Sequence, residues 1–205
     1  MRFALALVFL PTLLAQAPAS PTIPEMNDVN PDILKLVVYD QWDRGNDMFG
    51  SSQAPSDTKV DWDAVSKRDS ERRDAVRKLL ADGKLTTGKD YRFAALILQH
   101  SPDTAGYLLA HVLATTAIGR GDANARWLAA ATLDRYLQSL NQPQVFGTQF
   151  RKPEATWTME PFDRQAMSDA VRATWCVVPL AEQDRIVGEL QAGKPLRGTS
   201  IKDCK

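Results

Sequence analysis

The chain has 205 residues, of which 24% are charged and 44% hydrophobic, and its 25 basic and 25 acidic side chains give a formal net charge of zero. This is the composition of an ordinary globular protein, which excludes collagen-like, low-complexity and wholly disordered chains. Without a basic excess, a general binder of nucleic acid or of anionic membranes is not expected. Two cysteines are too few for a disulfide-rich scaffold or a four-cysteine zinc site.

Residues 1–19 have the pattern of a secretory signal peptide. Arg2 supplies a positive charge, an apolar stretch follows it, and Ala17 and Ala19 are placed for cleavage after Ala19. The apolar stretch is short for a membrane span, and no later segment is long and apolar enough to be one. We therefore expect an exported protein, periplasmic or extracellular, with no membrane span after signal cleavage. An uncleaved N-terminal anchor is the alternative.

Export changes how the cysteines are interpreted, because thiols in an oxidising compartment usually pair. A disulfide between Cys176 and Cys204 would tie the polar C-terminal segment to the body of the protein. The alternative is a free, buried Cys176 and a frayed Cys204. A catalytic thiol is disfavoured, since no histidine lies near either cysteine in the sequence.

The spacing of apolar residues and the helix start and stop signals predict an all-α fold. We expect a flexible leader over residues 20–30, a single helical domain over 31–192 and a C-terminal tail over 193–205. The domain should be an antiparallel bundle of about six to seven helices. Their expected boundaries are 31–45, 61–82, 90–100, 102–118, 122–141, 163–175 and 180–192. Residues 45–60 and 142–162 are predicted loops, the second with room for one short hairpin.

Three of these helices carry polar residues where their apolar stripes should continue toward the core. The stripes lead to Asp40 and Arg44 in the first helix, to Gln99 and His100 in the third, and to Asp134 and Arg135 in the fifth. Burying such groups without partners is costly, so we expect them to have partners in the fold.

One shared polar pocket would supply those partners. If the third, fourth and fifth helices alternate in direction, the C-terminal ends of the third and fifth lie together, beside the start of the loop at 142. The first helix joins them if it runs parallel to the third. The expected lining is Asp40, Gln41, Arg44, Gln99, His100, Asp134, Arg135, Gln144, Thr148 and Gln149. Gly147 would let the loop backbone turn sharply or approach a ligand closely.

The residue types in this pocket suit a small anionic or amide-bearing ligand. An imidazole beside a carboxylate is the minimum for acid–base catalysis, so His100 and Asp134 are the candidate catalytic pair. An arginine such as Arg135 can hold a carboxylate or phosphate through paired donors. We expect no cofactor and no metal, because the two histidines, His100 and His111, lie in no metal-binding motif.

Two other functions remain open. In the first, the protein is a hydrolase-like enzyme with His100 as general base and Arg135 as anion clamp. In the second, the polar group only specifies packing in a structural or protein-interaction module. Asp40 and Arg44 are then a surface pair at i,i+4 spacing, and the mixed charges of residues 67–78 decorate an exposed helix face.

Several of these segments resemble a bacterial family of unknown function. The resemblance covers about residues 33–185 and rests on a QH pair, a DR pair and a Q-[YF]-G-T-Q loop. Here these are Gln99-His100, Asp134-Arg135 and the segment 144–149. Phe146 stands where tyrosine is common, so no role for a tyrosine hydroxyl is carried over. The resemblance implies a shared site and brings no established reaction.

Overall fold

The computed structural model describes residues 20–46, 48, 60–196, 198–201 and 204. The predicted signal peptide and most of the predicted loop 45–60 lie outside these residues. Within them the chain is all-α, as predicted, and no extended strand occurs. The α-helices are α1 (Pro31–Trp42), α2 (Trp62–Ala81), α3 (Gly88–Leu98), α4 (Thr104–Gly119), α5 (Arg126–Ser139), α6 (Asp169–Thr174) and α7 (Leu180–Gln191).

Side-chain caps explain where two of the site-bearing helices begin. The side chain of Asn30 accepts hydrogen bonds from the first turn of α1, and Pro31 occupies the first helical position. Thr87 and Asp90 form a reciprocal capping box at the start of α3. This box starts α3 at Gly88, two residues before the predicted boundary.

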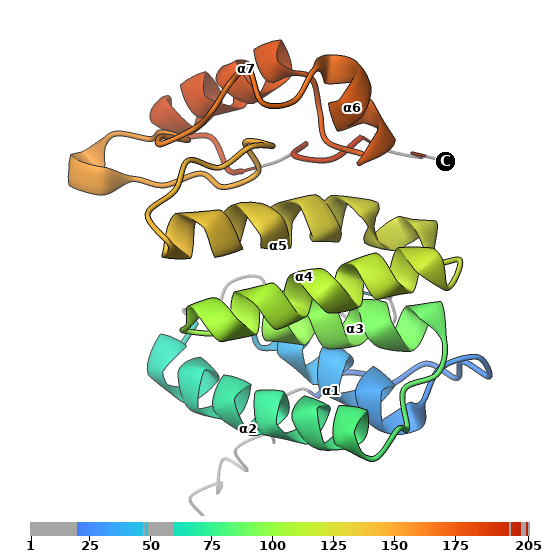
Figure 1. Ribbon diagram of the computed structural model, residues 1–205. Helices are drawn as coiled ribbons and strands as arrows, with labels where there is room; N and C mark the ends of the chain where they lie inside the picture. The colour runs from blue at the N-terminus through green and yellow to red at the C-terminus, as the bar shows by residue number, and fades with distance from the viewer. Residues whose placement is uncertain (1–19, 47, 49–59, 197, 202–203, 205) are drawn as a thin grey trace, which may run out of the picture.

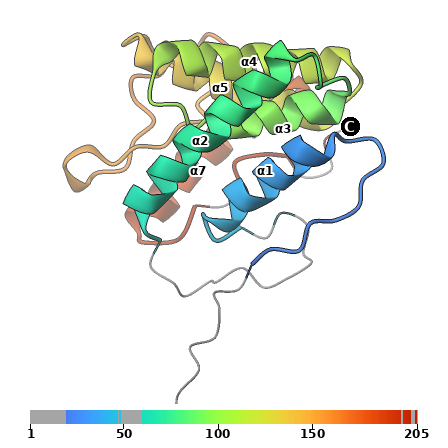
Figure 2. The same ribbon diagram turned by 90° about the horizontal axis from the view of Figure 1, so that it is seen from below.

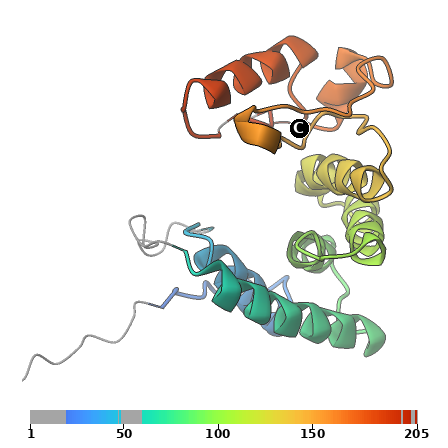
Figure 3. The same ribbon diagram turned by 90° about the vertical axis from the view of Figure 1, so that its left-hand side faces the viewer.

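The helices stack in layers, as Figures 1 and 3 show. α3, α4 and α5 are antiparallel neighbours in the middle, α1 and α2 cover one side, and α6 and α7 lie beyond α5. The main core is formed by apolar side chains of α1 to α5, among them Ile33, Phe93, Leu98 and Leu113. α1 runs parallel to α3, because Asn30 at the start of α1 bonds Asp90 at the start of α3 while their C-terminal ends also meet.

The segment after α5 differs most from the predicted elements. Residues 142–162 form a loop in which Arg151 and Thr158 make one antiparallel bridge, close to the predicted short hairpin. The predicted helix over 163–175 is shorter and covers only α6. Asp163 holds a turn by accepting the backbone N–H of Gln165 and of Ala166, and the helix is capped later, by Ser168.

No helix in the described part of the chain is both long and apolar enough to cross a bilayer. The predicted disulfide is present between Cys176 and Cys204. Next to it, the backbone N–H of Ile201 donates to the carbonyl of Cys176 (2.8 Å), and the indole of Trp127 on α5 donates to the carbonyl of Thr199 (2.8 Å). Thr199, Ile201 and Cys204 are therefore anchored to the body of the protein.

Replacing both cysteines by serine is expected to lower the free energy of unfolding by about 3 kcal/mol, because the bond closes a long loop of the unfolded chain. The sequence separation of the two cysteines is 28 residues. Urea denaturation of the variant and of the wild type measures the loss, and dithiothreitol should bring the wild type down to the variant. Equal stability of the oxidised wild type and the double-serine variant would contradict the expectation.

Candidate functional site

His100 and Asp40 meet where α1 and α3 end. His100 follows the C-cap of α3, and its Nε2 lies 3.6 Å from Oδ2 of Asp40. The Asp40 side chain is almost completely buried, and His100 retains 22% of its side-chain exposure. Asp40 also accepts hydrogen bonds from Gln41 Nε2 (2.7 Å) and Arg44 Nη1 (3.0 Å). The first helix thus joins the third at this end of the bundle, and Asp40 is the carboxylate beside His100.

A network of ion pairs ties this corner of α1 to α2. Arg44 Nη2 lies 2.5 Å from Asp69, which also pairs with Arg72 at 2.9 Å. Arg72 contacts Asp43 as well, and Arg68 lies 2.7 Å from Asp43. Asp69 and Arg72 are buried, so each charge needs the others as partners. Arg44 follows the C-cap of α1, and its ion pair with Asp69 on α2 holds it against Asp40.

Two more arginines approach His100 from other helices. Arg73 on α2 donates to the backbone carbonyl of His100 (3.1 Å). Arg135 on α5 lies close enough to act on the titration of His100. Its neighbour is the hydroxyl of Tyr107 on α4, and its Nε is buried without a hydrogen-bond partner. Among the described residues, Arg135 forms no ion pair with a carboxylate.

Burial and the surrounding charges set the protonation of the pair. Burial raises the pKa of the Asp40 carboxyl to about 6, although Arg44 acts in the opposite direction. Burial, followed by the positive charges of Arg44 and Arg135, lowers the pKa of His100 to about 3. At neutral pH, His100 is therefore a neutral imidazole next to an ionised carboxylate, and it is surrounded by guanidinium groups.

Asp134 lies on the other side of α5 and holds the loop that follows this helix. Its carboxylate accepts the backbone N–H groups of Val145 (2.8 Å), Phe146 (2.9 Å) and Thr148 (2.9 Å), and also the hydroxyl of Thr148 (2.7 Å). Burial raises the pKa of Asp134, and these hydrogen bonds oppose the rise. The Asp134 carboxylate therefore holds the loop at residues 145–148 in place through four hydrogen bonds.

The two loop glutamines are also used within the loop. The Gln144 side chain donates to the carbonyl of Gln149 (3.0 Å) and to that of Met159, and it accepts the backbone N–H of Gln149 (3.0 Å). The Gln149 amide donates to the carbonyl of Ala131 (3.3 Å) and to the hydroxyl of Thr148 (2.9 Å). These amides link α5, the loop and the segment around residue 159.

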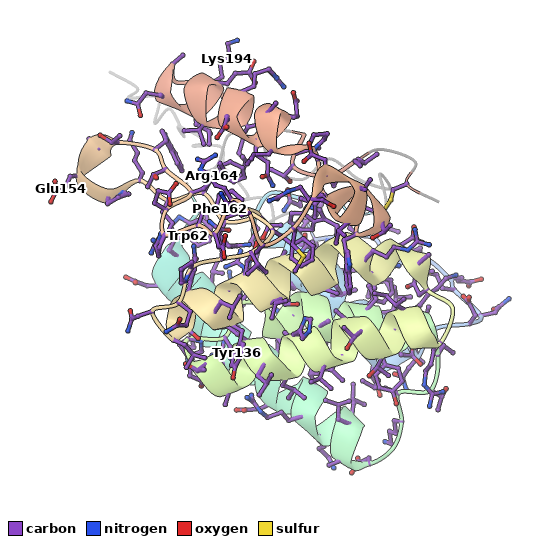
Figure 4. The ribbon with its side chains drawn as sticks, turned by 45° about the horizontal axis from the view of Figure 1, so that its top comes forward. Trp62, Tyr136, Glu154, Phe162, Arg164 and Lys194 are labelled. Atoms are coloured by element: carbon purple, nitrogen blue, oxygen red, sulfur yellow. A yellow bond between two sulfur atoms is a disulfide. The ribbon has the colours of Figure 1, made fainter. Side chains whose placement is uncertain are left out.

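Gly147 sits where the loop meets α7. Its φ of +74° and its close neighbours, Gln183 and Phe162, leave no room for a side chain. The carbonyl of Phe146 accepts the amide of Gln183 (2.7 Å) and the guanidinium of Arg172, which is fully buried. In Figure 4, Phe162 lies in this layer between α5 and α7. The backbone at Gly147 therefore lies close to other groups, as predicted, but those groups are the side chains of Gln183 and Phe162 and not a ligand.

The predicted pocket residues therefore form two groups on opposite sides of α5. The group at His100 contains Asp40, Gln41, Arg44, Gln99, His100 and Arg135. The loop group contains Asp134, Gln144, Gly147, Thr148 and Gln149. Asp134 and Arg135 are separated because successive residues of an α-helix point about 100° apart.

Sequence reasoning missed Asp69 and Arg72, and the interpretation of 67–78 as an exposed face is wrong at these two positions. The signal was present in the sequence. Both residues continue the apolar stripe of α2, which runs through Val65, Asp69, Arg72, Val76 and Leu79. Arg172 and Gln183 were also missed, and the six-residue α6 is too short for a periodic signal.

The remaining histidine lies elsewhere. His111 on α4 is bound through Nδ1 to the carbonyl of Ala129 (2.9 Å). Among the residues that the structure describes, no group of three or more His, Cys, Asp or Glu side chains is arranged to hold a metal ion.

Comparison with known families matches residues 50–194, well over half of the chain, to a family of unknown function, DUF6624. The chain belongs to this family. The DUF6624 match contains His100, Arg135 and the loop 144–149, and it begins after Asp40 and Arg44. The expected membership of a family of unknown function is confirmed, while the bacterial origin and the three motifs remain predictions. No curated protein and no solved structure matched this DUF6624 member.

Proposed function

We propose that this protein is exported and binds a small anionic ligand between His100 and Arg135. The observation that carries the proposal is the guanidinium of Arg135, which is largely withdrawn from water and has no carboxylate partner among the described residues. A buried cation without a counter-ion is costly, and a bound carboxylate or phosphate would supply the missing charge and acceptors. The neutral ring of His100 adds a donor or an acceptor without adding charge.

An anion is favoured over an amide-bearing ligand, because the glutamine side chains that could bind an amide already form hydrogen bonds within the protein. Gln144 and Gln149 already bond within the loop, and Gln41 bonds Asp40. Around His100, the guanidinium groups of Arg73 and Arg135 are left without a carboxylate partner among the described residues, and such groups recognise carboxylates and phosphates.

Export is supported by the signal-like pattern of residues 1–19 and by the disulfide, because such bonds persist in oxidising compartments. Expression of the full chain in a bacterial host and N-terminal sequencing of the exported product test this part. A mature chain that begins at Ser20 is expected. Retention in the cytoplasm with Met1 intact would contradict export.

Anion binding is tested by thermal shift and calorimetry with phosphate, sulfate, acetate and acidic amino acids. An anion at about 100 times its dissociation constant should stabilise the wild type by about 2.7 kcal/mol, and Arg135→Gln should abolish this gain. Arg126→Gln, on the same helix, is the matched control and should keep it.

The stability of Arg135→Gln without ligand separates binding from packing. The variant removes a half-buried charge that has no carboxylate partner among the described residues, so it should be as stable as the wild type or more stable. If Arg135→Gln is strongly destabilised and no anion protects the wild type, the polar group is structural and the proposal fails.

A hydrolase-like activity at the same site is the second candidate, and it is favoured by the 3.6 Å approach of His100 Nε2 to Asp40. The imidazole of His100 is neutral at neutral pH, as a general base requires, and its lowered pKa of about 3 makes it a weaker base than a free histidine. Hydrolysis of p-nitrophenyl acetate or p-nitrophenyl phosphate that is lost in His100→Gln and reduced in Asp40→Asn would support it. Unchanged hydrolysis in both variants would exclude His100 as the base.

A further inference from the structure

A cavity lies in the groove between α1 and α2, and one of its lining residues, Arg72, also approaches Asp40 at 3.9 Å. The cavity has a volume of about 590 Å³, within the range of about 300–1,000 Å³ that is common for small-molecule sites. The two helices lie side by side in Figure 2. The groove follows α2 from Arg68 to Asp82, which is about 21 Å of helix at about 1.5 Å per residue.

The middle of the groove is apolar. It is lined there by Leu36 and Tyr39 of α1 and by Ala75 and Leu79 of α2. Ala75 is the smallest of the four and lies half-buried midway along the groove, where a larger side chain would occupy the space. Water in such a place gains little from its neighbours, so an apolar group that displaces it is favoured.

The charges of the groove differ between its two ends. At the end that Arg68 and Arg72 line, these two arginines are paired with Asp43 and Asp69. These ion pairs neutralise the two arginines, and Glu71, which also lines the groove, forms no ion pair within the described residues. This end therefore offers an anion no free positive charge.

The other end carries one more positive than negative side chain, because three lysines line it together with the carboxylates of Asp32 and Asp82. Lys78 and Lys84 share one carboxylate, that of Asp82, at 3.0 and 4.0 Å. Lys35 lies on the same lining and forms no ion pair within the described residues. Lys84 is held at this end because Asn30, at the start of α1, donates to its carbonyl (3.2 Å).

We propose that the groove between α1 and α2 binds a free, single-chain amphipathic anion. Its apolar chain lies over Leu36, Ala75 and Leu79, and its carboxylate or phosphate meets Lys35 at the lysine-rich end. An apolar chain matches the middle of the groove and one negative group matches the lysine-rich end, whereas an uncharged chain gains no charge pairing there. This site is independent of the anion site at His100.

Calorimetry with decanoate below its micellar concentration tests the proposal, with 1-decanol as the uncharged analogue. Decanoate is expected to bind the wild type at least ten times more tightly than decanol. Lys35→Glu should weaken decanoate at least tenfold, and Ala75→Phe should abolish the binding of both. Arg77→Glu makes the same charge change on an α2 position outside the groove and should leave both affinities unchanged.

Backbone amide shifts on adding decanoate should cluster in α1 and α2. Failure of decanoate to bind, equal affinity for decanol, or equal losses in Lys35→Glu and Arg77→Glu would each overturn the proposal. Binding only to phosphatidylglycerol vesicles would overturn it as well, because a membrane surface would then be the ligand. Arg135→Gln should bind decanoate as the wild type does, so the outcome does not depend on the His100 site.

Discussion

Asp134→Ala is expected to destabilise the protein by about 4 kcal/mol. The change leaves the backbone N–H groups of Val145, Phe146 and Thr148 without their acceptor at the edge of the core. Each buried donor without a partner costs about 1–3 kcal/mol, and partial rehydration of the loop recovers some of that cost. Urea denaturation, monitored by circular dichroism, measures the change.

Two further variants test whether the loss of the loop hydrogen bonds causes the destabilisation of Asp134→Ala. Asp134→Asn keeps one oxygen acceptor and should cost about half as much as alanine. Asp103→Ala removes an N-cap carboxylate that accepts a single backbone N–H, that of Gly106, and should cost about 1 kcal/mol. If Asp134→Ala costs no more than Asp103→Ala, Asp134 does not hold the loop, and a role in ligand binding becomes the better explanation of its burial.

The opposite pKa shifts of Asp40 and His100 are expected to cancel in the pH dependence of the free energy of unfolding. Burial raises the pKa of Asp40 to about 6, whereas burial and nearby arginines lower the pKa of His100 to about 3. Between about pH 4 and 6 the folded protein carries a proton on Asp40 and none on His100. The unfolded chain carries a proton on His100 and none on Asp40. Both states bind one proton, so the pair adds no slope to the stability in this range.

Single variants should expose the two opposite slopes. In His100→Gln the folded state binds one proton more than the unfolded state, so stability relative to wild type rises by about 3 kcal/mol as the pH falls from 6 to 4. In Asp40→Asn the unfolded state binds the extra proton, on His100. Stability relative to wild type then falls by about 2 kcal/mol as the pH falls from 6.5 to 4.

Urea midpoints of the wild type and the variants at pH 4, 5, 6 and 7 measure these slopes. The double variant Asp40→Asn/His100→Gln is the control, because it removes both titrations and should regain the wild-type pH dependence. Parallel curves for the two single variants would show that Asp40 and His100 titrate with ordinary pKa values, and the buried dyad would lose its electrostatic basis.

Local signals in the sequence were sufficient for much of the fold. Apolar spacing and caps such as Asn30 and Thr87 act within one or two helical turns, so they place most helix boundaries to within a few residues. The shorter α6 is the exception, because the turn at Asp163 and the cap at Ser168 compete with a weak helical pattern. With only two cysteines, the disulfide partner was also determined by the sequence once export was assumed.

The sequence by itself also determined that Asp40, His100, Asp134 and Arg135 face inward, because each continues an apolar stripe. Which groups they meet was decided by the tertiary structure. Asp134 and Arg135 are adjacent in the chain, yet one holds the loop and the other turns toward His100. The rotation of a helix about its axis depends on packing against all its neighbours at once, and that packing leaves no mark in the local spacing of residues. Arg172 leaves none either, because α6 has only six residues.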